Sequence, residues 1–301
     1  MDKTINVLVT GYGPFPRGNG GQYARNASHL VTQLLPSSCT LDEPSVRINI
    51  LNPTSAEGEW VKVEYAYVRQ YTKQLHEKYD REVDLFLHLG QADGWHFVSV
   101  ERRAYKQGMT SDWWSSREET RGYYMIPDNA GKTIKDAGAC PWGEDVPMGL
   151  STALPVDAIV EGARAILKQG GTGRDISAAN LDKPITAIEE DPGKMLPVPN
   201  EAPPDALEDN KRDVMPVQGH HEAGPYCCGF IYYESLANRY VNNAKAEVLF
   251  CHVPGETDAA SVEKAKDAVL AIVQSAVREM LRKGGGKSVG VQDKGAVAPM
   301  A

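Results

Sequence analysis

The chain has 301 residues, of which 42% are hydrophobic and 24% are charged. This composition is ordinary for a globular protein and excludes a wholly disordered, collagen-like or coiled-coil chain. The formal net charge of -8 at pH 7 argues against nucleic acid or an anionic membrane surface as a partner. The apolar runs are only a handful of residues long, so we expect no segment that spans a bilayer.

The five cysteines are an odd number, and no two of them stand at C-x-x-C spacing. A secreted disulfide framework uses an even set, so we expect reduced thiols and a cytoplasmic protein. The residues after Met1 lead into a strand-like run and lack the apolar core of a signal peptide, which favours the same location.

Strand-like and helical segments alternate along the first half of the chain. Helices are predicted from a cap at Asn26 or Ser28, over residues 65–79 and over residues 155–168. The alternation predicts an α/β layered fold with a largely parallel sheet. Short apolar runs, typical of buried strands, lie at residues 5–10, 46–51, 83–89 and 97–100.

Residues 170–218 break this pattern. They contain seven prolines, ten acidic residues and few aliphatic ones, so they bury too little apolar surface to offset the entropy of ordering. We expect a disordered insertion here rather than a second domain. The Gly/Lys/Ala-rich residues 284–301 are expected to form a flexible tail. The prediction is therefore a single domain over residues 1–283, interrupted by the insertion.

The alternating pattern resumes after the insertion. A helix is predicted over residues 222–240, and a core strand over residues 246–251. A long amphipathic helix is predicted over residues 258–283, because its apolar residues recur at helical spacing and a glycine run follows it.

Two nucleotide-binding motifs are excluded. Gly11 and Gly13 follow the first predicted strand, but Pro16 occupies the third glycine position of a dinucleotide fingerprint. The acidic residue of a following βα unit is missing as well. No Gly-Lys-Ser/Thr follows a strand, so the sequence also lacks a Walker loop.

A metal site is an alternative that the side chains themselves raise. His220, His221, Cys227, Cys228 and His252 are suitable ligand types, but neither a C-x-x-C nor an H-E-x-x-H spacing is present. His220 and His221 border the proline-rich stretch, where a solvated loop is the simpler interpretation. We therefore expect no metal.

A nucleophilic cysteine is a further interpretation. Cys228 stands at the start of a predicted helix, where the helix dipole and the free N–H groups favour a thiolate and can hold an oxyanion. His252 follows a core strand and Glu101 ends another, so both are expected just beyond the edge of the sheet, where a base and its orienting carboxylate are needed. The competing interpretation is that Cys228 is an inert buried side chain.

Six blocks occur along the chain in the following order: Val7-Leu-Val-Thr-Gly-Tyr-Gly-Pro-Phe15, Leu87-His-Leu-Gly-Gln-Ala92, Glu101-Arg-Arg-Ala104, Ile126-Pro-Asp-Asn-Ala-Gly131, Ala223-Gly-Pro-Tyr-Cys-Cys228 and Phe250-Cys-His-Val-Pro254. Together they resemble the pyroglutamyl-peptidase I family of cysteine peptidases, from end to end outside the insertion and the tail. The resemblance implies a three-layer α/β/α sandwich with a twisted mixed sheet, and no cofactor. It also implies an omega-peptidase that removes pyroglutamyl (5-oxoprolyl) residues from the N-termini of small peptides.

The resemblance further implies catalytic residues. The nucleophile would be Cys228 rather than Cys227, because it stands two residues after the aromatic residue of its block. The base would be His252 and the third member Glu101, with Asp128 as an alternative partner for the histidine. His252 would take the proton of Cys228, the thiolate would attack the carbonyl after pyroglutamate, and water would hydrolyse the thioester.

By similarity, the lactam ring would lie in a small and mostly apolar pocket. Gln91 is suited to hydrogen-bond the lactam amide, because its own amide can donate and accept. For the aromatic members, ordinary core packing is an equally good interpretation. The expected lining residues are Tyr12, Phe15, Gln91, Ile126, Tyr226 and Cys227.

Three positions depart from the family pattern. Met125 stands where an arginine is usual, unless Arg117 or Arg121 supplies the charge. Gly229 replaces the Asn or Asp after the nucleophile, and Tyr12 replaces a Phe. These departures leave a second hypothesis open, a catalytically weak or inactive relative that binds pyroglutamyl peptides or another partner.

Overall fold

The computed structural model describes residues 3–16, 22–23, 25–41, 45–56, 58–110, 122–169 and 214–283. The strands are β1 (Lys3–Gly11), β2 (Phe15–Pro16), β3 (Gln22–Tyr23), β4 (Ser38–Leu41), β5 (Val46–Leu51), β6 (Leu85–Ala92), β7 (Val98–Tyr105), β8 (Gly149–Ser151), β9 (Val217–Glu222) and β10 (Glu247–Pro254). The helices are α1 (Ala27–Leu34), α2 (Tyr65–Tyr79), α3 (Val156–Lys168), α5 (Cys227–Asn242), α6 (Ala259–Arg282) and the short 3-10 helix η2 (Ile134–Ala137).

One mixed sheet of eight strands forms the centre of the molecule. Its order is β4-β5-β1-β6-β10-β7-β8, and β9 pairs with β7 away from this path. The central pairs β5-β1, β1-β6 and β6-β10 are parallel, as is β7-β9, whereas β4, β8 and the β10-β7 pair are antiparallel. Strands β2 and β3 form a separate antiparallel pair.

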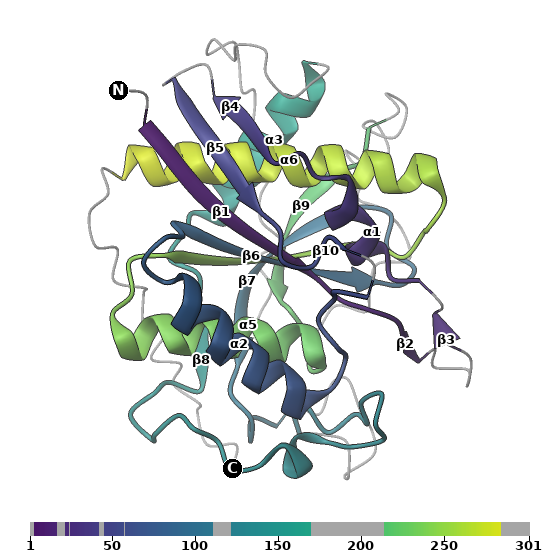
Figure 1. Cartoon of the computed structure of the whole chain (residues 1–301), viewed down its shortest axis with the longest axis vertical. Helices are drawn as coiled ribbons and strands as arrows, with labels where there is room; N and C mark the ends of the chain where they lie inside the picture. The colour runs from purple at the N-terminus through teal and green to yellow at the C-terminus, as the bar shows by residue number, and fades with distance from the viewer. Residues whose placement is uncertain are drawn as a thin grey trace, which may run out of the picture.

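Helices cover the sheet on both faces and make three layers (Figure 1). Helices α1, α3 and α6 share one hydrophobic core with one face of the sheet, and α2 and α5 share a second core with the opposite face. Parallel strands buried on both faces are expected to be apolar almost throughout, and β6 and β10 are buried along nearly their whole length. The structure is thus an α/β/α sandwich with a mixed and mostly parallel sheet, which confirms the predicted fold class.

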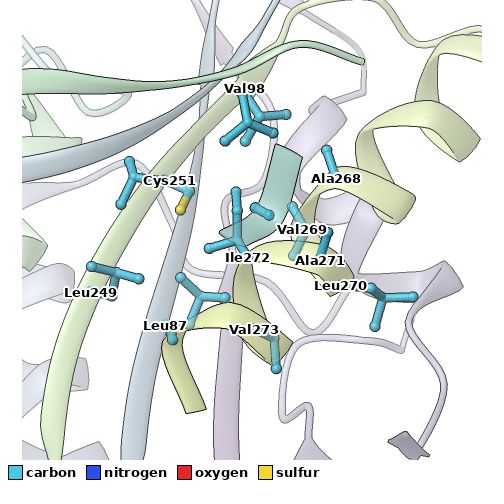
Figure 2. Close-up of a cluster of buried hydrophobic side chains, with 14 of the residues drawn as sticks. Leu87, Val98, Leu249, Cys251, Ala268, Val269, Leu270, Ala271, Ile272 and Val273 are labelled. Carbon is cyan, nitrogen blue, oxygen red and sulfur yellow. The ribbon is translucent and has the colours of Figure 1, made fainter. Parts of the chain in front are cut away.

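The core under α6 follows from the helical spacing of its apolar residues. Residues one and two turns apart lie on the same side of the helix, so a continuous stripe faces the sheet. Figure 2 shows this stripe against side chains of β6, β7 and β10. Burying one such aliphatic side chain stabilises the fold by about 1.5–3 kcal/mol. The labelled members on the two sides include Ala268, Val269, Ile272, Leu87, Val98, Leu249 and Cys251.

Local signals predicted several element ends correctly. Asn26 caps α1, because its side chain accepts a hydrogen bond from the backbone N–H of Ser28. Asp258 caps α6 in the same way, through the N–H of Ser261. Helix α2 covers residues 65–79 as predicted.

The region around residue 220 differs from the sequence prediction. Residues 217–222 form the strand β9, so the predicted insertion end at residue 218 and the predicted helix start at residue 222 are both wrong. The helix begins at Cys227 instead. The strand was missed because residues 218–221 are polar or glycine, while its pairing with β7 comes from a distant part of the chain. Residues 170–213 of the insertion and the tail 284–301 lie outside the described residues.

Within the part of the chain that the structure describes, no helix is both long and apolar enough to cross a membrane. All five cysteines are free, with Cys227 and Cys251 buried and the other three partly exposed.

Candidate active site

Cys228 lies in the first turn of α5, at the edge of the second core. The preceding turn passes through Gly224, whose φ of 81° is in the left-handed region that glycine tolerates best. The first N–H groups of a helix have no partner inside it, so α5 directs free donors and a positive dipole end toward its first residues. The Cys228 side chain is half-buried and therefore accessible from outside.

The turn and the helix approach each other closely at Gly229. A Cβ atom at this position would overlap the backbone carbonyl oxygen of Gly224. Only glycine therefore fits this backbone, which gives a physical reason for the departure at residue 229. An Asn or Asp here would force the first turn of α5 away from the turn before it.

His252 and Glu101 meet on neighbouring strands. His252 lies on β10 and Glu101 on β7, and His252 Nδ1 is 2.8 Å from Glu101 Oε1. Ser99 donates from its hydroxyl to the same carboxylate oxygen. Glu101 is fully buried, and His252 is 8% exposed. Both residues lie within their strands and not just beyond them, so that part of the prediction is wrong. Strand β7 does not end at Glu101, because it continues through charged residues to Tyr105.

Cys228 lies beside the ring of His252, because both side chains approach the same point at Gly90 and Cys228 raises the pKa of His252. Since Nδ1 is held by Glu101, the nitrogen left to serve Cys228 is Nε2. Gly90 on β6 leaves room for this approach. A Cβ there would be 2.7 Å from Cys228 Sγ and 3.2 Å from His252 Cδ2.

Charge stabilises the ionised forms along this chain. Burial raises the pKa of Glu101, but His220 and His252 outweigh it and hold the pKa at about 2. Burial lowers the pKa of His252, but the neighbouring Cys228 and Glu101 outweigh it and raise the pKa to about 10. The raised pKa makes the imidazole of His252 a stronger base toward a neighbouring proton donor.

Asp128, the alternative partner for the histidine, has another place. Its carboxylate accepts hydrogen bonds from the backbone N–H groups of Tyr65, Ala130 and Lys132. It therefore fixes the loop of residues 128–132 against the N-terminus of α2. The hydrogen-bond partner of His252 is Glu101.

Three of the expected lining residues cluster beside Cys228. The Tyr12 hydroxyl donates to the backbone carbonyl of Cys227, with an O···O distance of 2.6 Å. Tyr226 directly precedes α5, and its hydroxyl donates to the carbonyl of Pro127 at 3.3 Å. The extra hydroxyl of Tyr12 thus has a structural use, because it ties the first predicted block to the residue before the candidate nucleophile.

The other expected lining residues are more scattered. Phe15 is partly buried against the second core, whereas Ile126 is 36% exposed. Gln91 follows Gly90 on β6 and points to the opposite face, where its Oε1 accepts from the N–H of Ala27 at 2.8 Å. The accepting half of its amide is therefore occupied. Its buried Nε2 has no hydrogen-bond partner among the described residues.

Met125 packs partly buried against the second core. It supplies no charge, and Arg117 and Arg121 lie outside the described residues.

His220 is the residue that sequence reasoning missed. It lies on β9 directly opposite Glu101 in the parallel pairing, and its Nδ1 is 2.7 Å from Glu101 Oε2. The ring of Trp95 lies edge-on to both histidines, with centroid distances of 4.9 Å to His220 and 5.5 Å to His252. The sequence offered one signal for the strand that carries His220, because in α/β folds a strand commonly precedes the helix whose N-terminus carries a nucleophile.

A second chain of hydrogen-bonded side chains, with a similar order of chemical groups, lies deeper on the same face of the sheet. Ser235 Oγ is 2.6 Å from His76 Nε2, and His76 Nδ1 is 2.7 Å from Asp80 Oδ1. Ser235 Oγ also meets His88 Nε2 at 2.9 Å, and His88 Nδ1 meets Thr10 Oγ1 at 2.8 Å. Ser235, both histidines and Thr10 are buried, so this chain links α2, α5, β6 and β1 inside the core.

The metal-site alternative finds no cluster. Over the described ranges, no group of three or more His, Cys, Asp or Glu side chains is arranged to hold a metal ion. Cys227, one of the residues considered, is buried beside Tyr12.

Solved structures share this architecture. A variant of the pyrrolidone carboxyl peptidase from the hyperthermophile Pyrococcus furiosus aligns with a TM-score of 0.54 and 19% sequence identity, over 92% of this chain and 100% of that chain. The chain has the pyrrolidone carboxyl peptidase fold. The pyrrolidone carboxyl peptidase from Thermococcus litoralis aligns with a TM-score of 0.51 and 17% identity, over 95% of this chain and 99% of that chain. No family model and no curated protein matches the sequence.

Pyrrolidone carboxylic acid is another name for pyroglutamic acid. The pyrrolidone carboxyl peptidase fold therefore confirms, at the level of architecture, the resemblance that the six sequence blocks predicted.

Proposed function

We propose that this chain is a cysteine omega-peptidase that hydrolyses the amide bond after an N-terminal pyroglutamyl residue of small peptides. The observation that carries the proposal is the half-exposed thiol of Cys228 at the N-terminus of α5, beside a His252 ring that is hydrogen-bonded to the buried Glu101. The pyrrolidone carboxyl peptidase fold supports the substrate class.

The proposed mechanism begins with an ion pair. His252 Nε2 takes the proton of Cys228, and Glu101 holds the imidazolium through Nδ1. The thiolate then attacks the carbonyl between pyroglutamate and the next residue, and free N–H groups of the first α5 turn stabilise the oxyanion. The imidazolium protonates the leaving amine, and water hydrolyses the thioester with His252 again as base.

Substrate recognition is proposed to rest on the cluster beside the thiol. Tyr12, Tyr226 and Cys227 offer apolar and aromatic surface of the kind that a small neutral lactam ring requires, and Phe15 and Ile126 are proposed to extend it. A contribution from Gln91 would require its side chain to leave the N–H of Ala27 and turn from the opposite face toward the thiol.

A fluorogenic pyroglutamyl amide tests the proposal, with the corresponding prolyl amide as the control substrate. Wild-type protein is expected to release the fluorophore only from the pyroglutamyl amide. Cys228→Ala and His252→Ala are each expected to lower kcat more than about 10³-fold. Cys140→Ala, at another partly exposed thiol, is the matched control and should retain full activity.

Calorimetry with the same pyroglutamyl amide separates the proposal from the second hypothesis, a catalytically weak or inactive relative that binds without turnover. Binding without turnover by wild-type protein would identify a non-catalytic relative and contradict the proposed reaction. Turnover that survives in Cys228→Ala would contradict the assignment of the nucleophile, and Cys227→Ala in parallel would show which of the two adjacent thiols acts.

A further inference from the structure

The carboxylate of Glu101 has two oxygens, and only one of them faces His252 in the proposed Cys228–His252–Glu101 arrangement. Oε1 accepts from His252 and Ser99. Oε2 faces His220 Nδ1 at 2.7 Å. Glu101 is fully buried, so an Oε2 without a donor would be an unsatisfied charged oxygen inside the protein.

We propose that His220 is a positioning residue of the site, which holds Oε2 of Glu101 and thereby keeps Oε1 directed at His252. This inference rests on the proposed function for its effect on turnover. The contact itself is independent of the substrate.

The hydrogen bonds fix which nitrogen of His220 carries a proton. Its Nδ1 lies near two acceptors, Glu101 Oε2 at 2.7 Å and the backbone carbonyl oxygen of Glu222 at 2.9 Å. Neither oxygen can donate, because the carboxylate is ionised, so Nδ1 must be an N–H. His220 therefore acts on Glu101 as a donor.

Strand register and packing hold the ring of His220 in place. In the parallel pair of β7 and β9, Glu101 and His220 are direct partners, so both side chains project from the same face of the sheet. Trp95 contacts the rings of both His220 and His252 and stacks on Phe97 at a centroid distance of 4.7 Å. One aromatic side chain thus orders both histidines that bind the carboxylate.

Charge balance gives His220 a second effect. A thiolate at Cys228, an imidazolium at His252 and a carboxylate at Glu101 sum to one negative charge, and a protonated His220 brings the sum to zero. The pKa of His220 is raised, because Glu101 outweighs both burial and the repulsion from His252. The titratable and charged groups around His220 are Glu101 and Arg103 on β7, His252 on β10, and His221 and Glu222 on β9.

The direction of the effect follows from the influence of His220 on Glu101. Among the groups that lower the pKa of Glu101, His220 has the largest effect, ahead of His252. Loss of His220 therefore raises the pKa of Glu101. A protonated Glu101 no longer accepts from His252 Nδ1, so activity at low pH is lost first.

Three variants test the proposal. His220→Leu removes the donor and the charge, His220→Asn keeps an N–H close to the position of Nδ1, and His221→Asn is the matched control on the same strand. For His220→Leu we expect kcat to fall about 10–100-fold with KM changed less than about threefold, and the acid limb of the pH profile to move to higher pH. His220→Asn should recover most of the loss in kcat, and His221→Asn should match wild type.

The rate at which iodoacetamide alkylates Cys228, followed by mass spectrometry across pH, supplies a readout that needs no turnover. His220→Leu is expected to alkylate about tenfold more slowly near pH 6, because the ion pair that holds the thiolate is weakened. If wild-type protein cleaves no pyroglutamyl amide, the proposed function fails, while this measurement still decides the role of His220. The inference would be overturned by a His220→Leu variant whose kcat, pH profile and alkylation rate all equal those of wild-type protein. Equal losses in His220→Leu and His220→Asn would overturn it as well.

Discussion

The face of the sheet under α2 and α5 carries two chains of interacting side chains, and both have the same order of chemical groups. In one, the thiol of Cys228 meets His252 and then Glu101. In the other, the hydroxyl of Ser235 meets His76 and then Asp80. The histidine-to-carboxylate distances are similar, at 2.8 Å and 2.7 Å, but the burial is reversed, because the first chain buries its carboxylate and the second buries its nucleophile.

On the proposed function, this difference separates a reactive arrangement from a structural one. The thiol is half-buried and partly accessible, whereas Ser235 is fully covered and is also held by His88. The buried carboxylate keeps its full electrostatic effect on His252, while Asp80 is partly exposed and screened by solvent. The order of the groups is the same in both chains, so we expect access to the nucleophile and the effective charge of the carboxylate to decide which of them is catalytic.

Removal of each carboxylate tests this comparison most strongly. Glu101→Gln is expected to lower kcat by about 10²–10⁴-fold, because His252 loses both its orienting acceptor and the charge that stabilises the imidazolium. Asp80→Asn should leave kcat within about threefold of wild type. Steady-state kinetics with a pyroglutamyl amide measures both. Similar losses in the two variants would break the distinction between the chains.

Gly90→Ala should damage only the first chain. Its Cβ would be 2.7 Å from Cys228 Sγ and 2.8 Å from Phe250 Cζ, so the thiol must move relative to His252. A displacement of about 1 Å is enough to lower kcat by about 10²-fold. Kinetics and the alkylation rate of Cys228 check this, and unchanged values for both would show that the thiol and the imidazole tolerate separation.

Ser235→Ala should affect stability but not catalysis. The substitution leaves His76 Nε2 and His88 Nε2 buried without the hydroxyl that joins them. We expect the free energy of unfolding to fall by about 1–3 kcal/mol in chemical denaturation, with kcat within about threefold of wild type. A loss of activity larger than the loss of folded protein would instead connect the second chain to the reaction.

The two chains also predict opposite pH dependence of stability. Burial, with a smaller effect from His76, lowers the pKa of His88 from 6.5 to about 3, so the unfolded state binds more protons between these values. The contribution of His88 is therefore present above pH 6.5 and is lost as the pH falls toward 3. The pKa of His252 is raised to about 10, so its contribution is present below 6.5 and is lost as the pH rises through 10.

Thermal unfolding across pH checks this contrast. His88→Gln should flatten the acid side of the Tm curve, and His252→Gln should flatten the alkaline side. These are the smallest of the expected effects, because other groups titrate in the same windows. Parallel shifts of the whole curve in both variants would contradict the assigned pKa directions.

The sequence predicted those features that depend on neighbouring residues. The cap at Asn26, the helix over residues 65–79 and the apolar stripe of α6 are written in local spacing. The proximity of Cys228, His252 and Glu101 was also predicted, because each stands in a recognisable block beside a strand or helix end.

What the sequence could not predict depends on pairing between distant strands. Strand β9 has a polar interior, and its polarity makes sense only once His220 is placed opposite the buried Glu101, 119 residues away in the chain. The contact of Ser235 with His76 spans 159 residues and has no local signal. The close approach of Gly229 to Gly224 likewise becomes visible only in three dimensions.

The position of β9 in the sheet has a consequence for folding. Among the described strands, β9 pairs only with β7, so its register depends on that one pairing and on contacts such as the hydrogen bond from Arg164 Nε to the carbonyl of Val217. A slip of one residue would turn His220 to the other face of the sheet and bring a different residue opposite Glu101. Such a molecule would keep its helices but lose Val217 from the first core and one donor to the carboxylate. Catalytic rate would then report strand alignment more sensitively than circular dichroism.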